Sequence, residues 1–225
     1  MIHRRAAWTA EERAVLSRLR EPGLVQLFLD EEVGYNKEQD GETCRSPRRV
    51  LRDRVAHCIE GAFLAAAAFR YHGRAPAVLL LRAERDDDHV VALFRERKDR
   101  GAWGAVAKSN YAGLRFREPV YRSLRELAMS YFEHYYNLEA EKTLRARGRP
   151  VDLSRCDRLD WERTEEEMWE LSDALAGGPL VELIEPRQVR RLLRVDRRLE
   201  EAGLHGASEP PPAWPGRPPS PLAGV

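Results

Sequence analysis

The chain has 225 residues, of which 43% are hydrophobic and 33% charged, so it can bury a core beneath an unusually charged surface. Its 38 Lys and Arg residues nearly cancel its 37 Asp and Glu residues, which leaves a net charge of +1 and argues against nucleic acid or an anionic membrane as a partner. The three cysteines have no short pairing or metal spacing, which argues against a disulfide framework or a zinc site. No apolar run is long enough to span a bilayer and no secretory signal is present, so we expect a cytoplasmic protein without a cofactor.

The first part of the chain, residues 1–45, reads as a helical segment. Thr9 and Glu12 form a capping box before a helix that runs to about Leu19 and stops at Glu-Pro-Gly. Residues 24–36 predict a second, shorter helix that then turns.

A core region is expected over residues 46–120. Ser46 followed by Pro47 is a good N-cap and first-turn pair, and opens a helix. The stretch from Cys58 to Tyr71 is rich in alanine and leucine and predicts a buried helix that Gly73 ends. Three strands then follow, at residues 75–83, 89–96 and 102–109, of which the last two read as a hairpin around a polar turn.

Residues 121–204 read as a helical extension of the same domain. The expected helices cover residues 120–137, with Leu124, Leu127, Ala128 and Tyr131 on one face; residues 164–178, with a capping box at Thr164 and Glu167; and residues 185–203, with Val189, Leu192 and Leu193 inward. The tail at 205–225 is rich in proline and predicts disorder. The order of elements is that of an α+β domain.

Cys58 is the candidate nucleophile. A cysteine attacks as thiolate, and a helix N-terminus lowers its pKa. If the chain breaks near residues 56 and 57, Cys58 lies in the first helical turn and its own N–H can help to bind an oxyanion; if one helix runs from Pro47 to Tyr71, it lies mid-helix. The alternative is an inert, buried thiol, and Cys44 and Cys156 read as structural.

His89 is the candidate base. A hairpin centred on residue 99 places residue i opposite 198 − i, so His89 faces about Ser109, with Asn110 diagonal to it. Either side chain can accept the imidazole N–H and fix its tautomer. His57 is expected to be a helix-boundary residue, and the acidic run at 86–88 a solvated turn rather than a cation site.

These residues resemble the transglutaminase-like superfamily, a branch of the papain-like cysteine hydrolase fold, and in particular a bacterial group without an assigned substrate. The match lies in "CIEGAFLAAAAFRYHG", "APAVLLLRA", "DDDHVVALF" and "GAWGAVAKSN", over roughly residues 46–111. The resemblance implies a papain-like core, a buried helix followed by an antiparallel sheet, with catalytic residues in the order Cys, His, polar residue. The family usually has aspartate in the third place, where this chain has Lys108, Ser109 and Asn110.

The sequence therefore predicts a cysteine-dependent hydrolase or acyl-transferase that acts on an amide or peptide bond in a peptide, protein or small amide. Cys58 is the nucleophile, His89 the base, and Asn110 or Ser109 the orienting residue; Gln26 or Tyr35 could offer a further oxyanion donor. The candidate substrate-binding residues are Trp103, Lys108, Arg115 and Arg117, since arginine suits carboxylate or phosphate groups. The alternatives are a catalytically degenerate fold that binds proteins, or a helical assembly protein; the oligomeric state is open.

Overall fold

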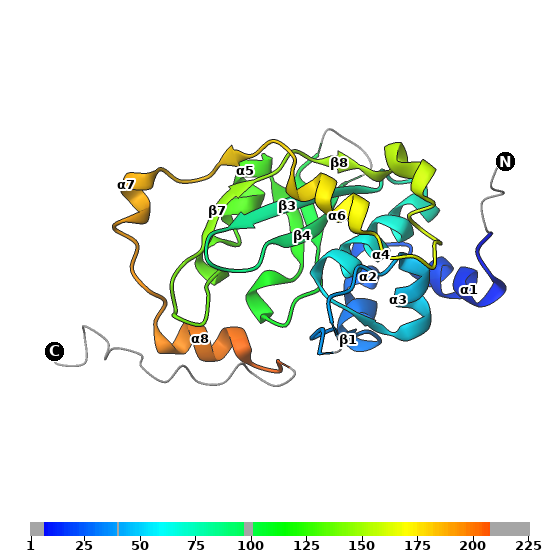
Figure 1. The fold of residues 1–225 in the computed structure, drawn as a ribbon, viewed down its shortest axis with the longest axis horizontal. Coiled ribbons are helices and arrows are strands. Elements are labelled where there is room, and N and C mark those ends of the chain that lie inside the picture. Colours follow the sequence, from blue (N-terminus) through cyan, green and yellow to red (C-terminus); the bar gives the residue numbers. More distant parts are fainter. Residues whose placement is uncertain (1–6, 40, 97–100, 208–225) are drawn as a thin grey trace.

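The computed structural model describes residues 7–39, 41–96 and 101–207. They form a mixed α+β fold with a large antiparallel sheet between two unequal helical layers (Figure 1). The expected disordered tail at 205–225 lies outside these residues except for its first three positions. None of the helices in the described part is long and apolar enough to cross a membrane.

The N-terminal helices begin and end largely where their capping residues predict. Thr9 and Glu12 form the expected capping box, and Ser46 accepts from the Arg49 N–H at the start of its helix. The short strands of this region pair in parallel, Gly34 with Val55 and Tyr35 with Ala56. The elements are α1 (Ala10–Arg18), α2 (Pro22–Glu31), β1 (Gly34–Tyr35), α3 (Pro47–Asp53), β2 (Val55–Ala56) and α4 (Cys58–Tyr71).

The main sheet has the strand order β6-β5-β4-β3-β7-β9, with β8 also paired to β3. All of its pairings are antiparallel, and the β4–β5 register joins Ala92 to Val106 and Arg95 to Trp103, as the hairpin centred on residue 99 predicts. The strands are β3 (Ala77–Ala83), β4 (His89–Arg95), β5 (Trp103–Val106), β6 (Arg117–Tyr121), β7 (Leu144–Arg147), β8 (Val151–Asp152) and β9 (Val181–Glu182).

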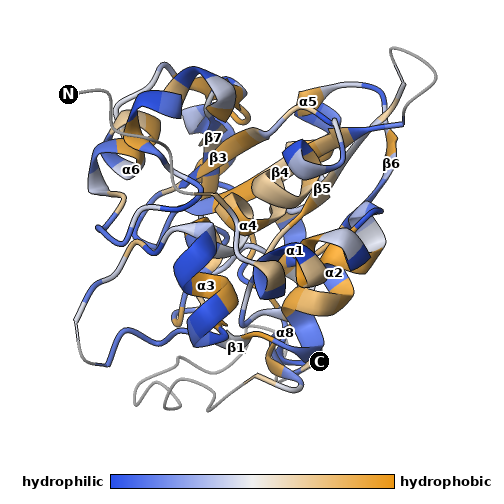
Figure 2. Cartoon of the chain, turned by 90° about the vertical axis from the view of Figure 1, so that its right-hand side faces the viewer, coloured by the Kyte–Doolittle hydropathy of each residue, from blue (hydrophilic) through white to orange (hydrophobic). Residues whose placement is uncertain are grey.

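The central strands are buried on both faces, so their sequences read as continuous apolar runs rather than as alternation. Val78 and Leu80 pack toward α4 and the N-terminal helices, whereas Leu79 and Leu81 belong to the core on the opposite face. Helix α4 lies against the sheet with Ala62 through Phe69 buried, as expected (Figure 2). The second core holds α5 (Leu124–Met129) and the 3-10 turns η1 (Ala112–Leu114) and η2 (Phe132–His134).

The C-terminal part of the chain is not the helical extension that the sequence predicts. It contributes β7, β8 and β9 to the sheet, together with the 3-10 segment η3 (Leu153–Leu159). The helix expected over 120–137 is short, because Val120 and Tyr121 belong to β6 and Ser123 caps α5 by accepting from the Glu126 N–H.

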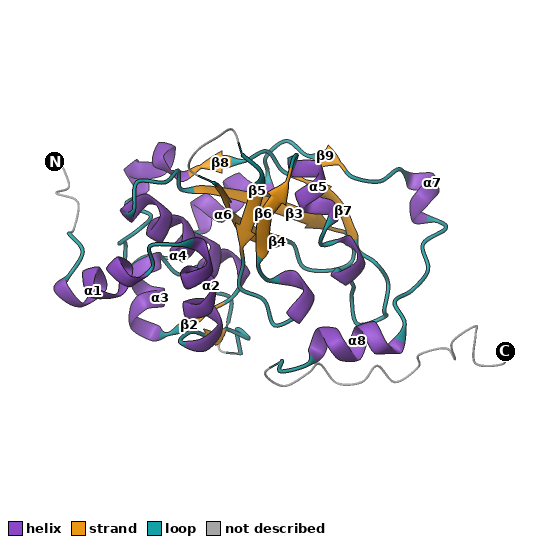
Figure 3. Cartoon of the chain, turned by 180° about the vertical axis from the view of Figure 1, so that it is seen from behind, coloured by secondary structure: helices purple, strands orange, loops and turns teal. Residues whose placement is uncertain are grey.

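The two remaining predicted helices also differ from expectation. The box at Thr164 and Glu167 does not form: α6 (Trp169–Ala176) starts later, and the Glu167 carboxylate instead accepts from the Cys44 N–H and pairs with Arg49. The last predicted helix is split into α7 (Pro186–Val189) and α8 (Arg197–Leu204), which Figure 3 shows as separate pieces on the outside of the molecule. Leu193, expected inward, is 78% exposed between them.

Candidate active site

Cys58 is the first residue of α4, so the chain does break before it. Helix α3 ends where Arg54 adopts a left-handed conformation with φ 55°, and β2 then leads to His57, the N-cap of α4. The first N–H groups of a helix have no acceptor within the helix, and its N-terminus carries partial positive charge. The Cys58 sulfur therefore lies where a thiolate and an oxyanion are both favoured.

The Cys58 thiol is strongly acidified. Burial on its own would raise its pKa, but hydrogen bonds and charge from His57 and His89 outweigh burial and lower the pKa to about 6. The side chain is half-buried, and its Sγ lies 3.7 Å from the carbonyl oxygen of Asp88. The lowered pKa favours the thiolate, which is the form that reacts.

His89 is the first residue of β4 and is only 4% exposed. Its Nε2 lies 2.9 Å from the carbonyl oxygen of Leu114, at the end of η1. Since a carbonyl only accepts, Nε2 carries the proton in this contact, and Nδ1 is left for the hydrogen bond with Cys58. The rings of Tyr131 and Tyr135 lie nearly perpendicular to the imidazole, with centroids 6.2 and 6.4 Å away.

The ring contact of His89 therefore differs from the one that the sequence predicts. Asn110 and Ser109 both lie in the lining of the cavity, but the acceptor of the Nε2 proton is the main-chain oxygen of Leu114. The Ser109 hydroxyl accepts from the Tyr111 N–H at 3.0 Å. A backbone carbonyl orients an imidazole as an asparagine would, but it brings no negative charge.

His57 is a site residue that sequence reasoning missed. It is the helix-boundary residue that was expected, but its ring also hydrogen-bonds the Cys58 thiol. Its Nε2 lies 2.8 Å from the carbonyl oxygen of Thr43, 3.5 Å from Glu38 Oε1 and 3.7 Å from Glu60 Oε1. The signal that could have found it is the run His-Cys-Ile-Glu, which puts an acid in the first turn of the helix beside the histidine.

Glu60 is a fully buried carboxylate beneath the site. Burial opposes its ionisation, but His57 and several hydrogen bonds lower its pKa below the usual value, so the group is charged. It accepts from the Thr43 hydroxyl and the Arg45 N–H at 2.8 Å each, and from the His57 N–H at 2.9 Å. These contacts hold His57, the residue before α4, and the segment at Thr43 and Arg45 against the first turn of the helix.

Cys58, His57 and His89 open into a cavity of about 930 Å³. Tyrosines contribute a large part of its wall, and carboxylates gather around it: the lining includes Tyr35, Tyr111, Tyr135, Tyr136, Glu38, Asp86, Asp87, Asp88 and Glu139. Burial and the neighbouring Cys58 thiolate raise the pKa of Tyr35, so its phenol keeps its proton and can donate it in a hydrogen bond. Gln26, the other predicted donor, is buried and bonds both the N–H and the carbonyl of Ala107, away from the cavity.

The predicted substrate-binding residues have structural partners. Trp103 stacks with Arg95, whose guanidinium carbon lies 3.9 Å from the ring centroid, and Trp103 does not line the cavity that holds Cys58. The ammonium group of Lys108 donates to the carbonyls of Leu29 and Val33 near the end of α2.

The two arginines also point to internal partners. Arg115 donates to the Ser109 carbonyl and pairs with Asp30 at 3.7 Å. Arg117 bonds the Ser130 hydroxyl and lies over the ring of Tyr131. These contacts account for both side chains within the fold, so the structure does not bring them together with Cys58.

The acidic run at 86–88 has the character of a structured turn. The Thr143 hydroxyl donates to Asp86, and Asp88 accepts from the Ala83 N–H and pairs with Arg82. Across residues 7–39, 41–96 and 101–207, no group of three or more His, Cys, Asp and Glu side chains is arranged to hold a metal ion.

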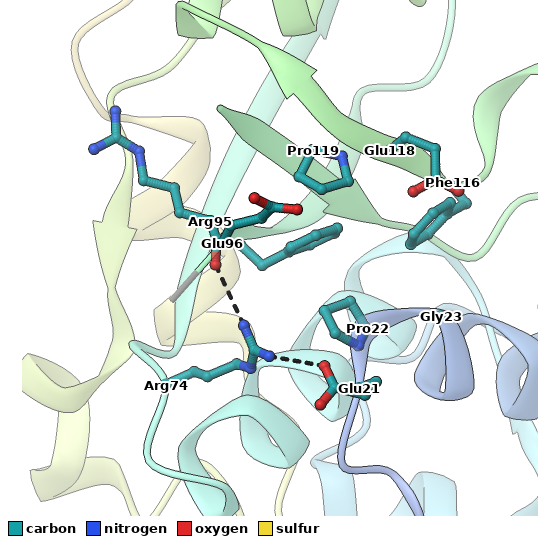
Figure 4. A pocket seen from close by; sticks show the side chains of 10 residues that line it. Glu21, Pro22, Gly23, Arg74, Arg95, Glu96, Phe116, Glu118 and Pro119 are labelled. Carbon is teal, nitrogen blue, oxygen red and sulfur yellow. Dashed lines mark hydrogen bonds and ion pairs between the residues drawn. The ribbon is translucent and has the colours of Figure 1, made fainter. Parts of the chain in front are cut away.

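A second pocket, of about 530 Å³, lies between α2 and the end of β4 (Figure 4). Its lining includes the stacked pair Phe94 and Phe116, and Arg74 bridges from Glu21 to the carbonyl of Arg95. Neither Cys58 nor a histidine lines it, whereas Cys58, His57 and His89 all line the larger cavity.

Comparison with models of known protein families found no match, and comparison with proteins of curated function found no relative.

Proposed function

We propose that the protein is a cysteine-dependent hydrolase or acyl-transferase that acts on an amide or peptide bond. The observation that carries the proposal is the position of Cys58, a thiolate at a helix N-terminus, hydrogen-bonded by two imidazoles and open to a substrate-sized cavity. Buried structural cysteines do not have this environment: burial raises the pKa of Cys44 to about 12.

In the first half of the reaction, the Cys58 thiolate attacks the substrate carbonyl carbon and a C–S bond forms. The negative charge moves to the carbonyl oxygen, where the Cys58 N–H and the Tyr35 phenol are the proposed donors. Nδ1 of His89 takes up the proton that the Cys58 thiol loses, and it passes this proton to the leaving amine as the C–N bond breaks. The product is a thioester on Cys58.

In the second half, His89 accepts a proton from water or from an acceptor amine, which attacks the thioester carbonyl. The C–S bond breaks, the acid or new amide is released, and the thiolate returns. His89 can accept a proton from either water or an amine, so the proposal includes both hydrolysis and acyl transfer.

The likeness to the transglutaminase-like, papain-like fold supports this assignment. The chain has a buried helix that starts at the cysteine, a sheet that packs on this helix, and a histidine at the start of a central strand. The departure is the third member, which is the Leu114 carbonyl rather than an aspartate. A reducing cytoplasm is the proposed location, because it would keep the three thiols free, as they are in the structure.

The test uses p-nitrophenyl acetate, an activated ester that acylates thiolates. We expect acetylation of the peptide that contains Cys58, followed by deacylation and steady turnover. Cys58→Ser removes both, and His89→Ala leaves the acetyl group on the protein or prevents its formation. Labelling of Cys58 no faster than that of Cys156 would contradict the proposal.

The neutral acceptor of His89 favours one alternative, a degenerate fold that binds proteins without chemistry. A carboxylate at this place would stabilise an imidazolium, and a carbonyl stabilises it less. That alternative predicts a stable acetyl-Cys58 that does not turn over in water or in the presence of amines, with folding and binding unaffected by Cys58→Ser.

A further inference from the structure

The two histidines around Cys58 have different surroundings. Nε2 of His57 lies among oxygen atoms that favour a positive ring, the Thr43 carbonyl at 2.8 Å and the carboxylates of Glu38 and Glu60 at 3.5 and 3.7 Å. Nε2 of His89 faces the neutral carbonyl of Leu114. The surroundings of His57 therefore favour a positively charged ring, whereas the contact of His89 orients its ring without favouring a charge.

We propose that His57 is a positioning residue whose imidazolium holds Cys58 as a thiolate, and that His89 alone exchanges protons with the substrate. This division of roles rests on the proposed function, because it concerns the same nucleophile. In a site with a single histidine, one ring must both stabilise the thiolate and protonate the leaving group. Here the two tasks are separated between the residue before the cysteine and the residue at the start of β4.

The charged groups that face His57 support a permanent imidazolium. Burial alone would lower its pKa, but the Cys58 thiolate and Glu60 raise the pKa to about 9. Glu38, from the loop after β1, adds a second carboxylate. Arg45 offsets part of this field, since it pairs with Glu60 at 3.2 Å, and Tyr35 keeps its proton and adds no charge.

A ring that keeps its proton to this extent is a poor proton donor at neutral pH, because general acids work best when their pKa lies near the working pH. Loss of the His57 proton would also leave the fully buried Glu60 carboxylate without one of its stabilising charges. The geometry therefore keeps the His57 proton in place throughout the reaction.

The test is the pH dependence of Cys58 alkylation by iodoacetamide, an uncharged reagent, followed peptide by peptide in the full chain by mass spectrometry. In the wild type we expect the rate to be half-maximal near pH 6. In His57→Gln the midpoint moves toward the ordinary thiol value of 9.0, so the rate at pH 7 falls on the order of tenfold or more. At pH 9.5 the rate returns to within a few-fold of the wild type, a recovery that structural damage would not show.

Glu38→Gln is the second variant, because it removes a charge beside His57 without touching the ring or the thiol. It should lower the pKa of the His57 ring, which the NMR shifts of that ring measure, while the alkylation midpoint of Cys58 stays near that of the wild type because the ring is still protonated at pH 6. Glu141→Gln is the matched control: this glutamate is also partly buried and ion-paired, but its partners are Arg85 and Arg194. The titration of the His57 ring in this variant should equal that of the wild type.

A folded His57→Gln protein with the wild-type midpoint overturns the division of roles, and so does slow alkylation at every pH. If that variant does not fold, a His57 ring that loses its proton below neutral pH in the wild type, or a His57 titration that is unchanged in Glu38→Gln, overturns it instead. These failures differ from failure of the proposed function, which would show in the wild type itself as a midpoint near 9.0.

Discussion

Gly61 and Lys108 touch where α4 passes the end of the hairpin: a Cβ built on Gly61 would lie 2.5 Å from the Cβ of Lys108. The absence of a side chain at Gly61 lets the Lys108 stem cross the first turn of α4 and reach the carbonyls of α2. The helix that carries the nucleophile can therefore pack closely against the segment that directly follows β5 because Gly61 has no side chain.

Gly61→Ala should destabilise the protein by about 1–3 kcal/mol, because the new methyl group forces two buried elements apart. Urea unfolding followed by circular dichroism measures the change. Gly23→Ala is the control, since Gly23 lies in α2 with nothing within 4 Å of its added Cβ. Alanine there should stabilise the helix by up to about 1 kcal/mol. Equal stabilities of the two variants would contradict the packing argument.

The sequence predicts several helix starts and the strand register near Cys58, because these depend on local signals. Ser46 and Pro47 start α3, the strand pattern on both sides of residue 99 agrees with the register of β4 and β5, and the small residues of α4 allow its burial. The break before Cys58 has no such signal, since it depends on Arg54 in a left-handed conformation that arginine rarely adopts.

The predictions that were wrong depend on contacts between segments that lie far apart in the sequence. In the sequence, Val120 and Tyr121 continue the helical pattern of the residues that follow them. In the structure they belong to β6, which pairs with β5. The acceptor for the His89 ring is the main-chain oxygen of Leu114. Every residue has such an oxygen, so the residue type at this position does not indicate the contact. No search for a third catalytic side chain could have found it.

The loop that presents the Leu114 carbonyl can be displaced without altering the nucleophile or the base. A Cβ on Gly113 would lie 2.5 Å from the Cβ of His134. Gly113→Ala should therefore shift the neighbouring carbonyl, misorient His89, and lower turnover of p-nitrophenyl acetate on the order of 10- to 100-fold. Ser109→Ala removes an acceptor that serves the Tyr111 N–H and should keep most of the turnover. The reverse order of losses would make Ser109 the orienting residue.

Arg117 is expected to act on stability rather than on substrate affinity. Its guanidinium donates to the Ser130 hydroxyl at 2.9 Å and the Gly113 carbonyl at 2.7 Å, and lies 3.9 Å from the centroid of Tyr131. Lysine cannot reproduce this forked, stacked contact, so Arg117→Lys should cost about 1–3 kcal/mol by denaturant unfolding. Arg115→Ala, at a position where the ion pair with Asp30 is long at 3.7 Å, should cost less than about 1 kcal/mol. A raised KM in folded Arg117→Lys with unchanged stability would restore its role as a substrate ligand.

Lys108 gives the stability a pH dependence that can be isolated by one substitution. Burial lowers the pKa of its ammonium group to about 8 from 10.5, although Asp30 opposes the shift. Between these two pH values the unfolded chain binds more protons at this residue than the folded chain, so its contribution to stability rises with pH. Lys108→Met removes this titrating group and therefore lacks its pH-dependent contribution to stability. The wild type should therefore gain stability relative to Lys108→Met between pH 7 and about 9.5, with a slope approaching one proton, or about 1.4 kcal/mol per pH unit. Urea unfolding of both proteins across this range measures it. A difference that stays constant would mean that folding does not shift the pKa of Lys108, and one that shrinks as the pH rises would mean that the carbonyls at the end of α2 raise this pKa instead of burial lowering it.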